Sequence, residues 1–146
     1  MDAVARKVLF ATPPKGGSLR DALPVVERLW RSHVGERVEL MLGWATEPFD
    51  RQWETREAAI GEVADCITRW EAEGRVELGE SDVHLLAPAC KVLFCHEADL
   101  HIESDDDSLL AEARAEFARL QWRCDQSVNG RWEPAQEGGL TEGDGA

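Results

Sequence analysis

Residues 82–104, DVHLLAPACKVLFCHEADLHIES, predict two strands that pair with each other in a sheet. Pro88 marks a turn between a strand at 82–87 and a strand at 91–104, and a turn this short favours antiparallel pairing. Alternation in the second strand predicts one dry face and one wet face, with a bend or bulge near 97–99. The dry face is expected to carry Phe94, His96, Ala98, Leu100 and Ile102, and the wet face Cys95, Glu97, Asp99, His101 and Glu103.

Hydrophobic spacing and turn residues predict further elements on both sides of this pair. Apolar residues at 6–12 and at 36–44 indicate two strands, with a helix between them that ends at Gly35. Because a helix separates the two strands, they are expected to form a right-handed parallel β-α-β unit. The other expected elements are a helix at 51–73, a strand at 75–78, a helix at 108–124 and a tight hairpin at 128–132.

These elements predict an α+β fold built as a two-layer sandwich. The expected order is β-α-β-α-β-β-β-α, with a mixed, mostly antiparallel sheet and with helices packed on one face. A chain of 146 residues fits one domain, which we place at 1–133. Residues 134–146 are rich in Gly and Glu, and they are expected to form a disordered acidic tail.

The charge of the chain restricts the kinds of partner it is expected to bind. Sixteen Lys and Arg oppose 29 Asp and Glu, which gives a net charge of −13. Negative charge repels phosphate groups, so we expect neither a nucleic-acid partner nor a membrane partner. A basic protein remains as a charged partner. With four cysteines and no apolar run near the roughly 20 residues of a membrane span, we expect a cytoplasmic protein with reduced thiols.

Histidines and cysteines in the middle of the chain raise the question of a metal site. The candidates are His84, Cys90, Cys95, His96 and His101. Cys90 and Cys95 are five residues apart, as are His96 and His101, and an odd offset along a strand sends side chains to opposite faces. Only a bulge would let either pair chelate one ion, whereas His84 and His96 are able to meet across neighbouring strands. The run from His96 to His101 is also one residue longer than the helical zinc-protease pattern H-E-x-x-H. We therefore expect no metal and no cofactor.

An acidic segment and a group of aromatic residues are the candidates for a partner-binding surface. Residues 97–107 contain no Lys or Arg, and acids grouped in this way present a negative surface to a basic protein. The acids at 105–107 also precede a predicted helix, where carboxylates cap free amide groups. Aromatic residues in a predicted loop at 44–49, and at the start of the helix that follows it, are hard to bury, and tryptophan is common at binding hot spots. The predicted partner-binding residues are Trp44, Phe49, Trp53, Glu97, Asp99, His101, Glu103, Asp105, Asp106 and Asp107.

The sequence favours a non-catalytic acidic binding protein that occupies a basic protein partner. Small acidic inhibitors of toxic enzymes, immunity proteins among them, have this general composition. No G-x-S-x-G nucleophile elbow and no P-loop spacing is present, so the sequence leans away from an enzyme without excluding one. Two alternatives stay open. One is a small enzyme or small-molecule-binding domain with a pocket near His84, His96 and Glu97, and the other is a subunit of a larger assembly.

Overall fold

The computed structural model describes residues 6–132, which form three α-helices and eight strands. The strands are β1 (Lys7–Thr12), β2 (Arg37–Leu42), β3 (Thr55–Ala59), β4 (Val83–Ala87), β5 (Cys90–Phe94), β6 (Leu100–Ser104), β7 (Arg123–Val128) and β8 (Arg131–Trp132). The α-helices are α1 (Leu23–His33), α2 (Val63–Ala72) and α3 (Asp107–Arg119), and short 3-10 turns span Leu19–Ala22, Phe49–Arg51 and Ile60–Glu62. The predicted tail at 134–146 lies outside the described residues.

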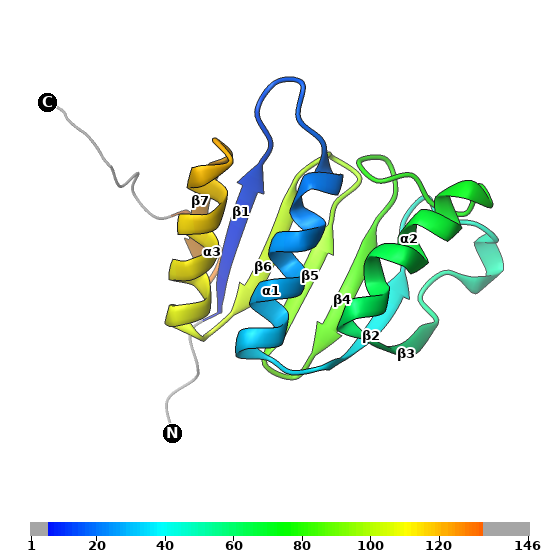
Figure 1. The fold of residues 1–146 in the computed structure, drawn as a ribbon, viewed down its shortest axis with the longest axis horizontal. Helices are drawn as coiled ribbons and strands as arrows, with labels where there is room; N and C mark the ends of the chain where they lie inside the picture. Colours follow the sequence, from blue (N-terminus) through cyan, green and yellow to red (C-terminus); the bar gives the residue numbers. More distant parts are fainter. Residues whose placement is uncertain (1–5, 133–146) are drawn as a thin grey trace, which may run out of the picture.

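All eight strands belong to one sheet, in the order β3-β2-β4-β5-β6-β1-β7-β8. The three α-helices lie on the same face of this sheet (Figure 1). The α+β class predicted from the sequence is therefore confirmed. The expected parallel component is absent, because every pairing between these described strands is antiparallel. Strands β1 and β2 do run in the same direction, but β6, β5 and β4 lie between them.

The hydrophobic core lies between the sheet and its helices. Leu9, Leu85 and Ile102 point from three strands into this core, and each is almost fully buried. On the helix side Trp30 is equally buried, and its indole N–H donates to the carbonyl oxygen of Arg37 at 3.0 Å. This bond satisfies the one polar atom of a large core ring, so burying the ring leaves no unpaired donor.

The helix expected at 51–73 is wrong in its first half. Residues 55–59 form the edge strand β3, which pairs with β2 from Arg37 to Met41. The sequence of β3, TREAA, is poor in the β-branched and aromatic residues that identify strands, so pairing with β2 overrides its local preference. The second half of the prediction holds, because Val63, Ile67 and Trp70 of α2 are buried at the expected helical spacing.

Of three further predictions from the sequence, the strand at 75–78 and the end of the last helix are wrong, and the hairpin at 128–132 is right. Only an isolated bridge between Leu78 and Ser81 forms where a strand was expected at 75–78. The helix predicted to reach residue 124 ends earlier, and β7 begins at Arg123. The hairpin at 128–132 is confirmed: Asn129 and Gly130 have φ angles of 53° and 82°, the conformation in which an Asn-Gly pair reverses two strands.

The long strand expected at 91–104 is divided in two by a turn. Strand β5 ends at Phe94 and β6 begins at Leu100. The turn is closed by the N–H of Cys95, which donates to the carbonyl oxygen of Asp99 at 2.9 Å, and by the N–H of Ala98, which donates to that of Cys95 at 3.0 Å. Ala98 takes a left-handed conformation with φ of 65°. His96 and Ala98 are exposed in this turn and do not share the dry face of Phe94, so that part of the prediction is wrong.

In the part of the chain that the structure describes, no helix is long and apolar enough to cross a membrane.

Replacing Ile102 by Ala tests the packing between sheet and helices. Ile102 faces Val26 and Leu29 of α1, where the space left over is only about 10 Å³. The truncation leaves a cavity, and we expect the free energy of unfolding to fall by about 2–5 kcal/mol. Leu120→Ala is the control, because Leu120 is exposed, and we expect a change within about 0.5 kcal/mol. Urea unfolding measures both, and equal losses in the two variants would contradict this packing.

Candidate functional site

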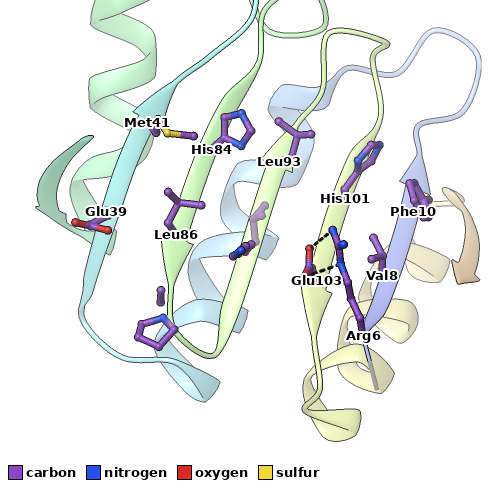
Figure 2. A pocket seen from close by; sticks show the side chains of 14 residues that line it. Arg6, Val8, Phe10, Glu39, Met41, His84, Leu86, Leu93, His101 and Glu103 are labelled. Atoms are coloured by element: carbon purple, nitrogen blue, oxygen red, sulfur yellow. Dashed lines mark hydrogen bonds and ion pairs between the residues drawn. The ribbon is translucent and has the colours of Figure 1, made fainter. Parts of the chain in front are cut away.

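The face of the sheet opposite the helices carries a row of alternating apolar and histidine side chains. Strand register places Met41 beside His84, His84 beside Leu93, Leu93 beside His101, and His101 beside Phe10. Figure 2 shows these five side chains standing across five neighbouring strands. They form part of the floor of a shallow hollow of about 700 Å³. This face therefore offers partly apolar surface that none of the three α-helices covers.

A charged pair lies beside this row. The guanidinium of Arg6 contacts the carboxylate of Glu103 at 2.9 Å, and both line the hollow together with Glu39 and Lys91 (Figure 2). The strand register aligns Glu39, Leu86, Lys91 and Glu103 as a second, more polar row. One side of the hollow is thus charged with mixed sign, while its centre is apolar.

A third row lies on the other side of the histidines, where β4 begins and β5 turns into β6. Asp82 is two residues before His84, Cys95 is two after Leu93, and Asp99 is two before His101. Because side chains two apart in a strand share a face, the three lie on the uncovered side of the sheet. Cys95 is buried, yet it does not belong to the core cluster between sheet and helices.

The turn between β5 and β6 brings metal-ligating atoms close together. Asp82, Cys95 and His96 offer ligand atoms that all lie within 4.8 Å of one another, and so do Cys95, Asp99 and His101. The Nδ1 of His96 lies 2.9 Å from Asp82 Oδ1 and 3.9 Å from Cys95 Sγ. The Nε2 of His101 lies 3.1 Å from Asp99 Oδ1. We call these five residues the Cys95 cluster.

The environment shifts the pKa values of several of these groups. Burial raises the pKa of the Cys95 thiol to about 11, and the carboxylates of Asp99 and Asp82 also raise it. The hydrogen bond to Asp82 raises the pKa of His96 above its ordinary value. Burial lowers the pKa of His84, against the opposing charge of Asp82. Among the described residues, the buried Nε2 of His84 has no hydrogen-bond partner.

Exposed aromatic rings flank the Cys95 cluster. Trp44, Phe49 and Trp53 are 58%, 77% and 54% exposed, as expected from their loop. The Trp44 ring lies 6.2 Å from that of His96, and the Trp53 ring lies 5.9 Å from that of His84. We call residues 43–54 the aromatic loop. It connects β2 to β3 and packs against one end of the uncovered face.

Gly43 allows the aromatic loop to lie against the sheet. A Cβ atom at this position would lie 2.8 Å from Trp53 Cζ3 and 2.9 Å from His84 Nε2. Trp53 itself has a φ of 72°, which is rare for a bulky residue, and its N–H donates to the carbonyl oxygen of Leu42 at 2.7 Å. The backbone thus holds the Trp53 ring directly over the glycine.

The acidic segment at 97–107 does not form one continuous patch. Strand β6 separates Glu97 and Asp99, at the turn, from the acids near the start of α3. Several of its carboxylates have partners within the chain. Glu103 pairs with Arg6, Asp107 pairs with Lys7, and Asp106 caps α3 by accepting from the N–H groups of Ser108 and Leu109. Exposed Asp105 forms no ion pair among the described residues.

The pocket predicted near His84, His96 and Glu97 has a different lining. His84 lines the hollow, and its second histidine is His101 rather than His96. His96 and Glu97 lie beyond it in the exposed turn. Sequence reasoning also missed Asp82, although its position two residues before His84 was a usable signal once 82–87 was read as a strand. Cys90 faces the core, away from the Cys95 cluster.

Comparison with known protein families, curated proteins and solved structures finds no match to this chain.

Replacing Gly43 by Ala tests the contact between the aromatic loop and the sheet. The added methyl group displaces the Trp53 ring or the His84 ring, and we expect a loss of about 1–3 kcal/mol in the free energy of unfolding. Gly61→Ala is the matched control, because the closest atom there is the mobile end of Arg31 at 3.0 Å. Urea unfolding and quenching of tryptophan emission by acrylamide measure the effect. A Gly43→Ala protein with unchanged stability and unchanged quenching would contradict the contact.

Proposed function

We propose that this protein binds a basic protein partner through the aromatic loop and an acidic hollow beside it. The hollow has a volume of about 420 Å³ and is lined by Glu47, Glu71, Glu77 and Glu80, with one arginine, Arg75. Because four carboxylates surround one arginine, the hollow favours a cationic side chain from a partner. This arrangement, next to exposed tryptophans, is the observation that carries the proposal.

The two parts of the proposed surface are tied together by backbone contacts. The N–H of Asp82 donates to the carbonyl oxygen of Trp44 at 2.8 Å, and the Ser81 hydroxyl donates to that of Ala45 at 2.7 Å. The N–H of Glu47 in turn donates to the carbonyl oxygen of Arg75 at 2.9 Å. These bonds fix Trp44 beside the acidic hollow, so one partner segment is able to meet both.

The charges of the hollow are available to a partner. Glu47, Glu77 and Glu80 are exposed and form no ion pair within the part of the chain described here. Glu71 is already engaged, because it pairs with Arg20. A lysine or arginine entering the hollow gains three unpaired carboxylates. Trp44 directly precedes Ala45 of the lining, and we propose that its exposed ring adds a face for cation–π contact with the same partner segment.

Of the predicted partner-binding residues, we keep those at this end of the sheet. Trp44, Phe49, Trp53 and Glu97 lie on the aromatic loop or in the neighbouring turn. Asp106 caps the start of α3, Asp107 pairs with Lys7, and Glu103 pairs with Arg6. These three carboxylates are therefore less available to a partner.

We also propose a cytoplasmic location. Support comes from the four cysteines, all of which are free thiols, three of them buried. Thiols persist in this form in a reducing compartment.

The proposal predicts two properties of the interaction. Trp44→Ala removes a large ring at the centre of the surface, and we expect a loss of about 2 kcal/mol in binding free energy, or about thirtyfold in Kd. Added salt screens the carboxylates, so we expect the association rate to fall as salt is raised.

The test starts with capture on the immobilised full chain, followed by identification and purification of each captured protein and measurement of its Kd. Reversal of two charges in Glu77→Lys/Glu80→Lys is expected to abolish binding. Asp105→Lys, an exposed acid at the far end of β6, is the control for a charge reversal elsewhere and is expected to bind normally. A basic partner with this pattern supports the proposal. Partners that are acidic, or that bind the Trp44→Ala and Glu77→Lys/Glu80→Lys proteins as well as the native chain, would overturn it.

A further inference from the structure

The Cys95 cluster joins sulfur, nitrogen and oxygen ligand atoms at one turn of the sheet. Cys95 directly follows β5, and His96 is the next residue in the turn. Asp82 directly precedes β4, the strand that pairs with β5. The backbone N–H and the ring Nδ1 of His96 both lie within hydrogen-bond distance of Asp82 Oδ1, at 2.7 Å and 2.9 Å. The His96 ring is therefore held with one nitrogen between the carboxylate and the thiol.

The spacing of these atoms suits a small tetrahedral cation. Zinc binds nitrogen and oxygen at about 2.0–2.1 Å and sulfur at about 2.3 Å, which places two of its ligand atoms about 3.3–3.6 Å apart. The Nδ1 of His96 lies 2.9 Å from Asp82 Oδ1 and 3.9 Å from Cys95 Sγ, so shifts of a few tenths of an ångström bring both pairs to that spacing. Such shifts are within the freedom of an exposed histidine in a turn.

The chemistry of the donors selects the class of ion. Magnesium and calcium prefer oxygen ligands, whereas a set of one thiolate, one imidazole and one carboxylate suits zinc and related divalent transition metals. We propose that Asp82, Cys95 and His96 bind one zinc-class ion at the start of the β5–β6 turn.

The surroundings leave room for a fourth ligand. The side chain of His96 is 41% exposed, so an ion enters from solvent on this side and keeps a water molecule in its fourth position. Asp99 and His101 also offer ligand atoms within 4.8 Å of the Cys95 sulfur, and they are hydrogen-bonded to each other at 3.1 Å. They are outer polar groups beside the sulfur. The charge of the ion offsets the repulsion between the thiolate and the Asp99 carboxylate once the ion has replaced the thiol proton, which passes to solvent.

Cobalt titration of the chelator-treated full chain tests the site. Cobalt replaces zinc in such sites, and a thiolate ligand gives an intense near-ultraviolet absorption that exposed carboxylates do not give. We expect one equivalent of Co²⁺ to produce this absorption and Zn²⁺ to remove it. Metal analysis of the untreated protein accompanies the titration.

Three variants decide which residues hold the ion. Cys95→Ser is expected to lose the absorption, and His96→Gln, at an exposed position, is expected to weaken Co²⁺ binding by at least about tenfold. Cys124→Ser is the thiol control, because Cys124 lies on β7 away from the cluster, and it is expected to bind Co²⁺ like the native chain. No absorption in the native chain, absorption that survives Cys95→Ser, or unchanged affinity in His96→Gln would each overturn the proposal.

This inference does not rest on the proposed partner. The titration uses the chain alone, and the partner test uses the aromatic loop and its neighbouring glutamates, so failure of one leaves the other standing.

Discussion

Antiparallel pairing in a sheet that carries its helices on one face is the constraint on which the other features depend. Each strand sends alternate side chains to the two faces. Apolar side chains such as those of Leu9, Leu85 and Ile102 point to the helix side, where they are buried and form the core. The same alternation sends Phe10, His84 and His101 to the opposite face. The composition of the uncovered face is thus a direct consequence of how the core is built.

The turn from β5 to β6 brings side chains of the uncovered face together in the Cys95 cluster. With Cys95 paired to Asp99 at the base of the turn, both side chains lie on the uncovered face beside Asp82. A slip of one residue would send Cys95 toward the helices and bring a core residue such as Phe94 to the surface, because strand faces alternate with period two. Burial of Phe94 and Leu100 against the helices therefore holds the register that assembles the cluster.

The sequence predicted the fold where local pattern and tertiary packing agree. The stripe of Val63, Ile67 and Trp70 identified α2, and Asn129-Gly130 identified the last hairpin, because helix burial and hairpin turns both leave short-range signals. Strand β3 has no such signal. Its residues are weak strand formers, and the edge of the preceding strand β2 gives them a pairing partner, so the signal lies outside the segment itself.

The candidate site was also only partly predictable from the sequence. Exposure of Trp44 and Phe49 followed from their place in a predicted loop, and that of Trp53 from its place near a predicted helix start. The prediction of no metal site rested on a strand at 91–104, with at most a bend or bulge near 97–99. A full turn replaces that part of the strand, so the offset of five residues no longer separates the side chains there. In the acidic hollow, Glu71, Glu77 and Glu80 are close in sequence, whereas Glu47 is distant, and only folding brings it to them.

The most direct test of this account is the side-chain environment of Cys95 in solution. Nuclear Overhauser contacts from its β-protons, measured on the full chain, report which face of the sheet it occupies. The account predicts contacts to Asp82 and Asp99 and none to the methyl groups of α1. Contacts from Cys95 to Val26 or Leu29 would show the opposite register and would contradict it.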